Sequence, residues 1–276
     1  MTTQTPQAQD RQLGDFAHVD SADAGDLVAR LDAMHSLASF RTYKKETFEL
    51  LWPAPGARLA DIGCGTGEDA RSLRQLVEPE GSVIGFDLSA AMLDQARARH
   101  GDLPGLSFEN APSDALGAPD ASFDGVRADR VLIHVPSPAA TLQEMIRVTK
   151  PGGRIVISEP DMPACWVASN DYAVTDRIMR EIALSCVSPY LPRDLWTMFK
   201  DAGLKEVTLT VRAVTAFDPV SVGKILDFTG VITSMMARQL VTEQEVANWS
   251  AEFAERGRAG RFAAGVPIMI VAGTKT

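Results

Sequence analysis

Residues 61–67 (Asp-Ile-Gly-Cys-Gly-Thr-Gly) form the segment of this sequence with the clearest chemical meaning. They follow a short apolar run, residues 58–62, that predicts a β-strand, and they precede a helical pattern that begins at Glu68. Glycine permits positive φ values and lets a ligand come close to the backbone. The segment therefore predicts a small-molecule site at the carboxyl edge of a parallel sheet.

Asp87 ends the next expected strand, and its carboxylate can accept hydrogen bonds from both hydroxyls of a ribose. The alternative is a strand-end aspartate that caps the following helix. The glycine spacing is Gly-x-Gly-x-Gly, whereas dinucleotide-binding enzymes use Gly-x-Gly-x-x-Gly and place a pyrophosphate on the helix N-terminus. This spacing argues against a NAD-dependent oxidoreductase, for which the sequence also lacks a recognisable hydride-transfer set.

Strands and helices alternate along the middle of the chain. Short apolar runs predict the strands, and apolar residues three or four positions apart predict the helices. Such alternation is typical of a doubly wound sheet with parallel pairing. The expected strands span residues 58–62, 82–87, 106–109, 123–128, 154–158, 206–214 and 267–272, and the expected helices 68–76, 89–99, 136–149, 195–202, 220–236 and 242–255.

Segments outside this alternation are expected to cover the site. Residues 1–20 are predicted to be a flexible tail, and residues 21–52 an N-terminal helical lid. The remaining domain, residues 53–276, contains a proline-interrupted insertion at about 160–192 that is predicted to act as a cap. Long excursions of this kind tend to be functional in compact domains.

Composition narrows the class of protein. The chain has 276 residues, of which 45% are hydrophobic and 23% charged, which is typical of a globular protein. The net charge of −9 argues against a nucleic-acid partner, because phosphate binding needs clustered Lys and Arg. The three cysteines (Cys64, Cys165 and Cys186) suit neither a zinc site nor a disulfide framework, so no metal is expected. We expect a cytoplasmic protein without a signal peptide or membrane span. A homodimer is a possible assembly of this chain.

Taken together, these residues resemble the class I S-adenosylmethionine-dependent methyltransferases, and most closely the small-molecule branch related to ubiquinone/menaquinone-biosynthesis methyltransferases. The resemblance is firm over residues 40–160. Besides the glycine segment, it rests on residues 83–89 (Val-Ile-Gly-Phe-Asp-Leu-Ser) with Met92, the Phe-Asp pair at 123–124, and Lys-Pro-Gly-Gly-Arg at 150–154. The resemblance implies a Rossmann-like, doubly wound, mostly parallel sheet of seven strands, with a helical cap formed by the N-terminal helices and the insertion after the fifth strand.

The resemblance also implies where S-adenosyl-L-methionine binds. Asp87 would hold the ribose, Leu88 and Met92 the adenine, and Asp61 with Gly63 the methionine end. We interpret Cys64 as a small buried side chain rather than a nucleophile. The full predicted cofactor set is Asp61, Gly63, Cys64, Gly65, Thr66, Gly67, Asp87, Leu88, Met92, Ser113, Asp114 and Arg130.

One position departs from the family pattern. The family usually has an Asp-Ala pair after the third strand, and its aspartate accepts from the adenine amino group. Pro112 and Ser113 stand there in this chain. Asp114 or Asn110 can replace the missing carboxylate, and Ser113 can still offer its backbone N–H.

Three residues are candidates for catalysis. Arg130 can hold a carboxylate of the acceptor or of the methionine moiety. His134 can act as a general base, and its alternative is a helix-start residue bonded to backbone. Tyr43 can touch the methionine end, and its alternative is ordinary packing. Trp166 and Tyr172 in the insertion are expected to provide apolar cover.

The expected reaction is in-line methyl transfer to a small molecule, in which the protein supplies alignment and exclusion of water. A non-methylating use of the same cofactor stays open, for example cyclisation to azetidine-2-carboxylate with release of methylthioadenosine. A catalytically silent binding module is a third reading. Nothing in the sequence specifies the acceptor.

Overall fold

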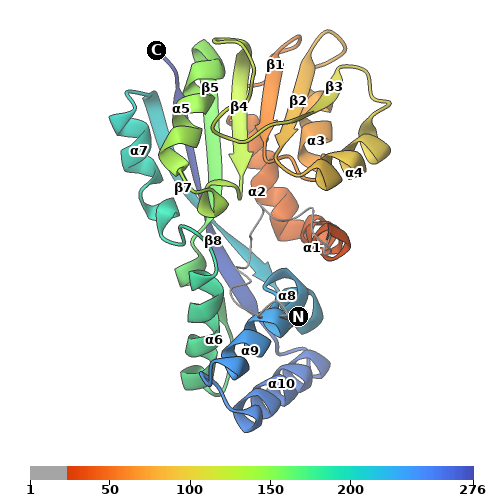
Figure 1. The fold of residues 1–276 in the computed structure, drawn as a ribbon, viewed down its shortest axis with the longest axis vertical. Coiled ribbons are helices and arrows are strands. Elements are labelled where there is room, and N and C mark those ends of the chain that lie inside the picture. Colours follow the sequence, from red (N-terminus) through yellow and green to blue (C-terminus); the bar gives the residue numbers. More distant parts are fainter. Residues whose placement is uncertain (1–23) are drawn as a thin grey trace, which may run out of the picture.

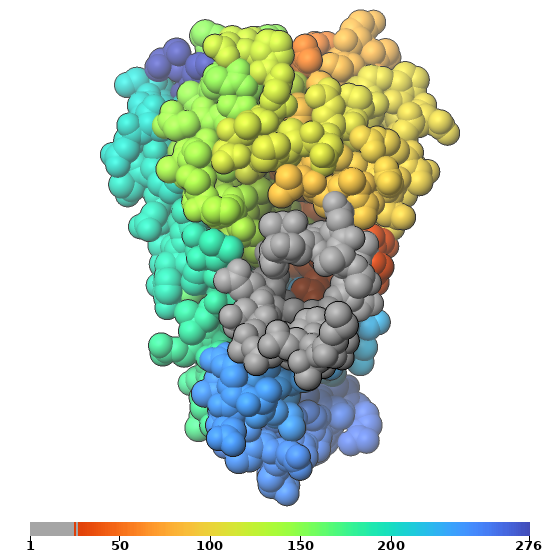
Figure 2. Space-filling view, in the orientation of Figure 1, coloured from red at the N-terminus to blue at the C-terminus, as the bar shows by residue number. Residues whose placement is uncertain are grey.

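A computed structural model describes residues 24–276 of the chain. The predicted tail, residues 1–20, lies outside the described residues. Figure 1 shows two parts, a sheet with helices on its faces and, below it, a smaller lobe made of helices. Figure 2 shows the same outline with side chains included, and the blue C-terminal helices form its lower end.

The sheet has eight strands, which confirms the Rossmann-like prediction and adds one strand to it. Five parallel strands run in the order β3-β2-β1-β4-β5, after which β8 pairs antiparallel with β5, β6 and β7. The addition is the two-residue β6. The strands are β1 (Arg58–Ile62), β2 (Ser82–Asp87), β3 (Leu106–Asn110), β4 (Phe123–Asp129), β5 (Thr149–Pro160), β6 (Trp166–Val167), β7 (Lys205–Ala216) and β8 (Ala264–Thr274).

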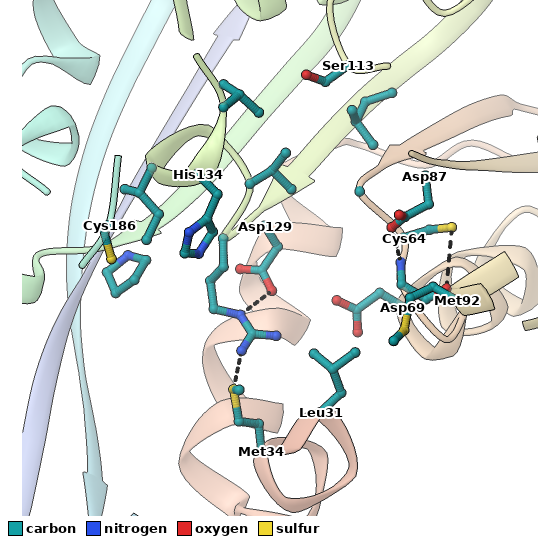
Figure 3. A pocket seen from close by; sticks show the side chains of 18 of the residues that line it. Leu31, Met34, Cys64, Asp69, Asp87, Met92, Ser113, Asp129, His134 and Cys186 are labelled. Atoms are coloured by element: carbon teal, nitrogen blue, oxygen red, sulfur yellow. Dashed lines mark hydrogen bonds and ion pairs between the residues drawn. The ribbon is translucent and has the colours of Figure 1, made fainter. Parts of the chain in front are cut away.

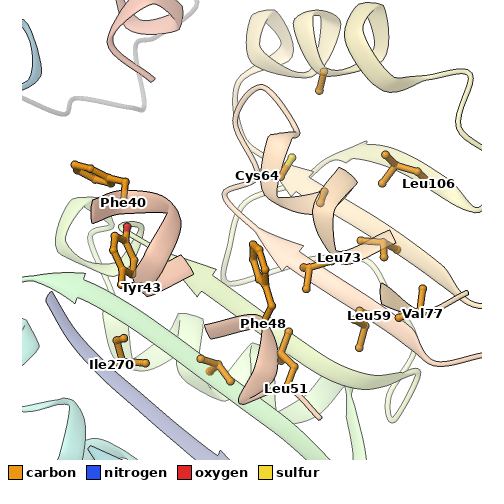
Figure 4. Packing of buried hydrophobic residues seen from close by; sticks show 14 of the residues in the cluster. Phe40, Tyr43, Phe48, Leu51, Leu59, Cys64, Leu73, Val77, Leu106 and Ile270 are labelled. Carbon is orange, nitrogen blue, oxygen red and sulfur yellow. The ribbon is translucent and has the colours of Figure 1, made fainter. Parts of the chain in front are cut away.

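Apolar side chains on both faces of the sheet hold two layers of helices. One cluster joins α1 (Ala24–Ser36), α2 (Ala38–Glu49), α3 (Glu68–Leu76) and α4 (Ala90–His100) to the sheet. Figure 4 shows its packing around Phe48, Leu51, Leu59 and Leu73. A second cluster joins α5 (Pro138–Val148) and α7 (Leu195–Asp201) to the opposite face. Burying both faces is what makes the central strands near-continuous apolar runs.

The lower lobe is larger than the predicted insertion. Its core joins α6 (Tyr172–Leu184) of the insertion to α8 (Pro219–Ile225), α9 (Phe228–Ala237) and α10 (Glu243–Arg258), which lie between β7 and β8. An aromatic group of Phe228, Trp249 and Phe253 occupies its centre. The predicted cap, which combines the N-terminal helices with the insertion at 160–192, includes α6 but not α8, α9 or α10.

The single helix expected over residues 220–236 is wrong. The chain forms α8 and α9, separated by Leu226 and Asp227. Asp227 adopts a left-handed conformation (φ 49°), and its side chain accepts from the Gly230 N–H and caps α9. Apolar periodicity continues through such a break, so it does not reveal one. Within residues 24–276, no single helix has the length and apolar composition to cross a membrane, and only α8 and α9 taken together have both.

Candidate active site

The loop after β1 turns through three glycines with positive φ: Gly63 (65°), Gly65 (52°) and Gly67 (82°). A Cβ on Gly63 would lie within 2.4 Å of the Val131 side chain, and one on Gly67 would lie 2.8 Å from Phe108. Conformation and space both exclude a larger residue at these two positions. The loop can therefore pass close beneath a ligand at the end of β1.

Asp87 is fixed in front of this loop. Its Oδ2 accepts from the Gly65 N–H at 2.8 Å, and its Oδ1 accepts from the Ser89 N–H at 2.9 Å. The N-cap of α4 is Ser89, whose hydroxyl accepts from the Met92 N–H at 3.1 Å. Ser89 thus caps α4, while Asp87 fixes the backbone of the glycine loop through Gly65 and that of the α4 start through Ser89.

The predicted adenine side lies beside Asp87. Leu88, Met92, Ser113 and Asp114 all line one cavity with Asp87. The Ser113 hydroxyl hydrogen-bonds the Thr141 hydroxyl at 2.8 Å. Asn110 donates to the backbone oxygens of Asp87 and Leu88 and does not line the cavity, so of the two proposed substitutes only Asp114 lines it.

The cavity has a volume of about 320 Å³ and runs from the glycine loop to the helical lobe. In Figure 3, Asp87, Cys64 and Met92 lie at one end, His134 and Cys186 at the other, and Asp129 between them. All predicted cofactor residues line it except Gly67, which begins α3 behind the loop. Burial raises the pKa of the Cys64 thiol well above its usual value, as expected for an unreactive side chain.

A cluster of buried charges forms the floor between the two ends. Arg127 is almost fully buried in β4 and contacts Asp61 at 2.9 Å, Asp69 at 3.1 Å and Asp129 at 3.4 Å. Lys44 of α2 contacts Asp69 at 2.7 Å and Asp129 at 3.6 Å. Buried ions need such partners, because removing one leaves the others uncompensated.

The carboxylates of this cluster differ in acidity. Burial raises the pKa of Asp61 to about 7, against the opposing effect of Arg127. Burial also opposes ionisation of Asp69 and Asp129, but Lys44 and Arg127 acting on Asp69, and Arg127 and Arg130 acting on Asp129, hold both pKa values below the usual range. Asp61 is thus the carboxylate of the three that gains most from an additional cation.

Tyr43 is buried within this arrangement and does not line the cavity. Its hydroxyl donates to both oxygens of Asp129, at 3.1 and 3.2 Å. Burial raises the pKa of this hydroxyl well above its usual value. The structure thus gives Tyr43 a partner in the protein, and its predicted contact with the cofactor stays a prediction.

Arg130 lies between the charged floor and the far end of the cavity. It has a left-handed backbone (φ 59°), and its N–H donates to the Ser158 carbonyl at 2.8 Å. Its guanidinium lies over the Phe40 ring, 5.2 Å from the centroid, and contacts the Met34 sulfur. Its closest carboxylate is Asp129, 3.4 Å from Nε.

His134 lines the far end of the cavity on a short helical turn, residues 132–134. Its backbone N–H donates to the Val131 carbonyl at 3.0 Å. Burial and the Arg130 cation lower the pKa of its imidazole to about 3. The ring is neutral at physiological pH, and its low basicity makes it a weak proton acceptor.

Glu159 holds the backbone of this turn from behind. It is fully buried at the end of β5, and its Oε1 accepts from the N–H groups of Val131 and Leu132 at 2.8 and 2.6 Å. Burial raises the pKa of its carboxyl to about 8, although these N–H groups favour the charged form. Glu159 therefore fixes the backbone between Arg130, with its left-handed conformation, and His134.

Sequence reasoning missed several residues of this site, namely Met34, His35, Phe40, Asp69, Arg127, Asp129 and Glu159. A usable signal existed in β4, where Arg127 and Asp129 interrupt a central strand buried on both faces. Charges at such positions need buried partners. The expected apolar cover by Trp166 and Tyr172 is wrong: both are exposed, at 47% and 59%, and neither lines the cavity.

Comparison with known proteins identifies the family. A family model described as a methyltransferase domain matches residues 54–203, which is more than half of the chain. The chain belongs to the class I S-adenosylmethionine-dependent methyltransferases. The match includes the glycine loop, Asp87, β4 and the insertion.

Curated relatives agree with this membership. An uncharacterised 37.1 kDa transposon protein of Streptomyces fradiae is 37% identical over 67% of this methyltransferase and 54% of the relative. A demethylmenaquinone methyltransferase of Oceanobacillus iheyensis is 35% identical over 50% and 60% of the two chains. A ubiquinone/menaquinone biosynthesis C-methyltransferase of Hahella chejuensis is 34% identical over 54% and 62%. The methyltransferase spans a little over half of the length of these relatives.

Solved structures confirm the fold. YcgJ of Bacillus subtilis superposes with a TM-score of 0.60 at 17% identity, covering 85% of this methyltransferase and 98% of that chain. Phosphoethanolamine N-methyltransferase 2 of Haemonchus contortus, in complex with S-adenosyl-L-methionine, superposes with a TM-score of 0.61 at 17% identity, covering 95% and 60%. At these identities the likeness concerns the fold alone.

The cavity fits S-adenosylmethionine, the cofactor of this family. Asp61 lines the cavity. Of its two carboxylate oxygens, only Oδ1 accepts a hydrogen bond from the residues at 24–276, namely from Arg127. Its Oδ2 can accept from an ammonium group. Asp87 offers acceptors for the ribose, and the glycine loop leaves room for the chain between them. When bound, the cofactor supplies an activated methyl group, and the protein holds and aligns it.

Proposed function

We propose that this methyltransferase transfers a methyl group from S-adenosylmethionine to a small, largely apolar acceptor bound at the far end of the cavity. One observation carries the proposal: the cofactor residues and an apolar chamber belong to one continuous cavity. The chamber is lined by side chains from the lid helices, the sheet edge and the helical lobe. They include Met34, Phe40, Ile133, Met162, Ile182 and Ile225.

The protein's contribution is then placement and exclusion of water. Asp61 holds the methionine end of the cofactor and Asp87 its ribose, and the anchored turn at residues 130–134 faces the acceptor. A closed apolar chamber strengthens electrostatic contacts and keeps water from competing with the acceptor. His134 is a weak proton acceptor, so the proposed reaction relies on an acceptor that reacts without strong general-base assistance.

The name of the Oceanobacillus relative points to quinone-like rings as a first acceptor class to examine. The proposal includes the predicted domain division, a cytoplasmic location and a homodimer. In this division the lid consists of α1 and α2, and the cap extends beyond residues 160–192 to include α8–α10.

The nucleoside product tests the proposed function. The full chain is incubated with S-adenosylmethionine and fractionated cell extract, and the nucleosides are separated by chromatography. S-adenosylhomocysteine formed together with a methylated product supports the proposal. Methylthioadenosine overturns it in favour of attack elsewhere on the cofactor, and cofactor binding without turnover in any fraction favours a silent module.

A further inference from the structure

Arg130 is a permanent cation at the inner boundary of the apolar chamber. The side chain of Arg130 is only 15% exposed, yet it lines the cavity. It runs from the end of β4 toward Met34 and Phe40, which belong to the chamber. The acidic residues that line the cavity are Asp61, Asp87 and Asp129 at strand ends, Asp69 in the first turn of α3, and Asp114 in the loop after β3.

Arg130 is poorly neutralised by its one carboxylate partner. Asp129 accepts from the hydroxyls of Tyr43 and Ser158, the latter at 2.6 Å, and it also faces two other cations, Lys44 and Arg127. Arg130 reaches it through Nε alone, at 3.4 Å. Two hydroxyls and three cations thus share the single Asp129 carboxylate.

The other contacts of Arg130 do not supply a second anion. A methionine sulfur is a weak acceptor, and the face of the Phe40 ring attracts a cation without accepting its N–H bonds. Within residues 24–276, no oxygen or nitrogen accepts from either terminal nitrogen of the guanidinium. A largely buried guanidinium with unused donors favours a ligand anion that can take two parallel hydrogen bonds.

We propose that Arg130 is the anion-binding residue of the acceptor chamber, and that the acceptor is an apolar molecule carrying an ionised oxygen group, a carboxylate or a phenolate. This inference rests on the proposed function and narrows its substrate class. The side chain points toward Met34 and Phe40, which line the acceptor chamber, and on this ground we assign it to the acceptor. The S-adenosylhomocysteine affinity of the Arg130 variants tests the alternative, in which Arg130 holds the methionine carboxylate. Where the ionised oxygen is itself the attacking atom, it carries no proton to remove, which agrees with the weakly basic His134.

The test uses the full chain saturated with S-adenosylhomocysteine and a pair of probes that differ in charge. Isothermal titration calorimetry compares 2-naphthoate with 2-naphthamide, which has nearly the same shape but is neutral. We expect naphthoate to bind at least about tenfold more tightly, as hydrogen bonds to charged groups allow. Arg130→Met and Arg130→Gln should each reduce this preference to less than about twofold. Two substitutions are made so that the comparison can still be completed if one of the variants does not fold.

Arg30→Met is the matched control. Arg30 also lines the cavity, but Asp227 lies 3.6 Å from it, and its loss should leave the preference unchanged. Equal or absent binding of both probes by the wild type overturns the inference, as does a preference that survives in the Arg130 variants. It is also overturned if these variants lose S-adenosylhomocysteine affinity to the same degree, because Arg130 then serves the methionine end. Failure of the wild type to bind S-adenosylhomocysteine would instead contradict the proposed function.

Discussion

Arg127 and Asp61 form a fully buried ion pair, with 2.9 Å between Nη1 and Oδ1, at the point where the cofactor side of the cavity meets its charged floor. The pair joins two neighbouring strands, since Asp61 lies opposite Arg127 in the parallel register of β1 and β4. Arg127 also donates from Nε to the Thr47 hydroxyl at 2.8 Å, which connects the sheet to the lid helix α2. The Arg127 guanidinium therefore contacts both Asp61 of the predicted cofactor site and Thr47 of the lid helix α2.

Replacing Arg127 by Met should destabilise the protein by about 3–5 kcal/mol, because three buried carboxylates lose their common cation. Asp61→Asn should cost less, since Arg127 keeps Asp69 and Asp129, but it should weaken S-adenosylhomocysteine binding. Urea unfolding and calorimetry measure the two effects. Lys45→Met, at an exposed ion pair with Glu49, is the control and should change neither. Equal loss of stability in both cavity variants would mean that Asp61 serves the fold alone.

Asp87→Ala should weaken S-adenosylhomocysteine binding by about 1.5–3 kcal/mol, the range for hydrogen bonds to a charged group. The change removes the proposed ribose contact and the carboxylate that fixes the Gly65 N–H. Asp87→Asn should lose less, because an amide oxygen can still accept from Gly65. Asp94→Ala, on an exposed part of α4, is the control. Unchanged affinity in folded Asp87→Ala would restrict Asp87 to a role in shaping the loop.

The unliganded protein should lose stability as the pH rises from 6.5 to 8. Asp61 and Glu159 have folded-state pKa values of about 7 and 8, raised by burial, whereas both carboxyls are already ionised in the unfolded chain over this range. The folded state therefore binds more protons, and its stability falls with pH by on the order of 1–2 kcal/mol. His134 acts in the opposite direction, because it is neutral in the fold, with a pKa of about 3, whereas the unfolded imidazole is about half protonated at pH 6.5. Its contribution, about 0.4 kcal/mol, is smaller than that of the two carboxyls.

Thermal unfolding across this pH range measures the slope. Glu159→Gln should flatten it, since the amide keeps an acceptor for the Val131 and Leu132 N–H groups and cannot titrate. Glu144→Gln is the matched control: hydrogen bonds from Arg147 hold the pKa of Glu144 below its usual value, so its titration lies outside the window. A slope that persists in Glu159→Gln at its full size would assign the effect to other groups.

The sheet was predictable because its signals are local. Glycine at positions 63 and 67 and the apolar runs of β1 and β2 specify a strand, a turn and a helix without reference to the rest of the chain. The charged floor was not predictable in the same way. Lys44 and Asp129 are 85 positions apart, and nothing but the folded register brings their side chains to 3.6 Å.

The helical lobe illustrates a second limit. Its helices were largely recognised from periodicity, but their association was not, because α6 and α10 are far apart in the sequence and come together through the pairing of β7 with β8. A contact such as the Trp249 indole donating to the Thr175 hydroxyl at 3.0 Å leaves no trace in spacing. Which segment covers a site thus depends on long-range packing rather than on which segment interrupts the alternation.

The last prediction is that α1 and α8 close together over the cavity during turnover. The two helices are in contact, Leu31 of α1 and Ile225 of α8 both line the cavity, and Arg30 lies 3.6 Å from Asp227 at the start of α9. Most elements behind them belong to the rigid sheet, so motion between lid and lobe is the simplest way to admit an acceptor. Hydrogen exchange should show increased protection over residues 24–36 and 219–237 when S-adenosylhomocysteine is bound, and more when 2-naphthoate is added.

Asp227→Asn tests this closure directly. Asparagine tolerates the left-handed conformation and can still cap α9, so the variant removes the charge while keeping the break between α8 and α9. We expect faster exchange in α1 and less ligand-induced protection there. Arg238→Gln, which removes an ion pair with Glu181 inside the lobe, is the control and should leave α1 unchanged. If protection rises only over residues 61–92 in the wild type, the lid and lobe are fixed in place, and the acceptor must reach the chamber by another route.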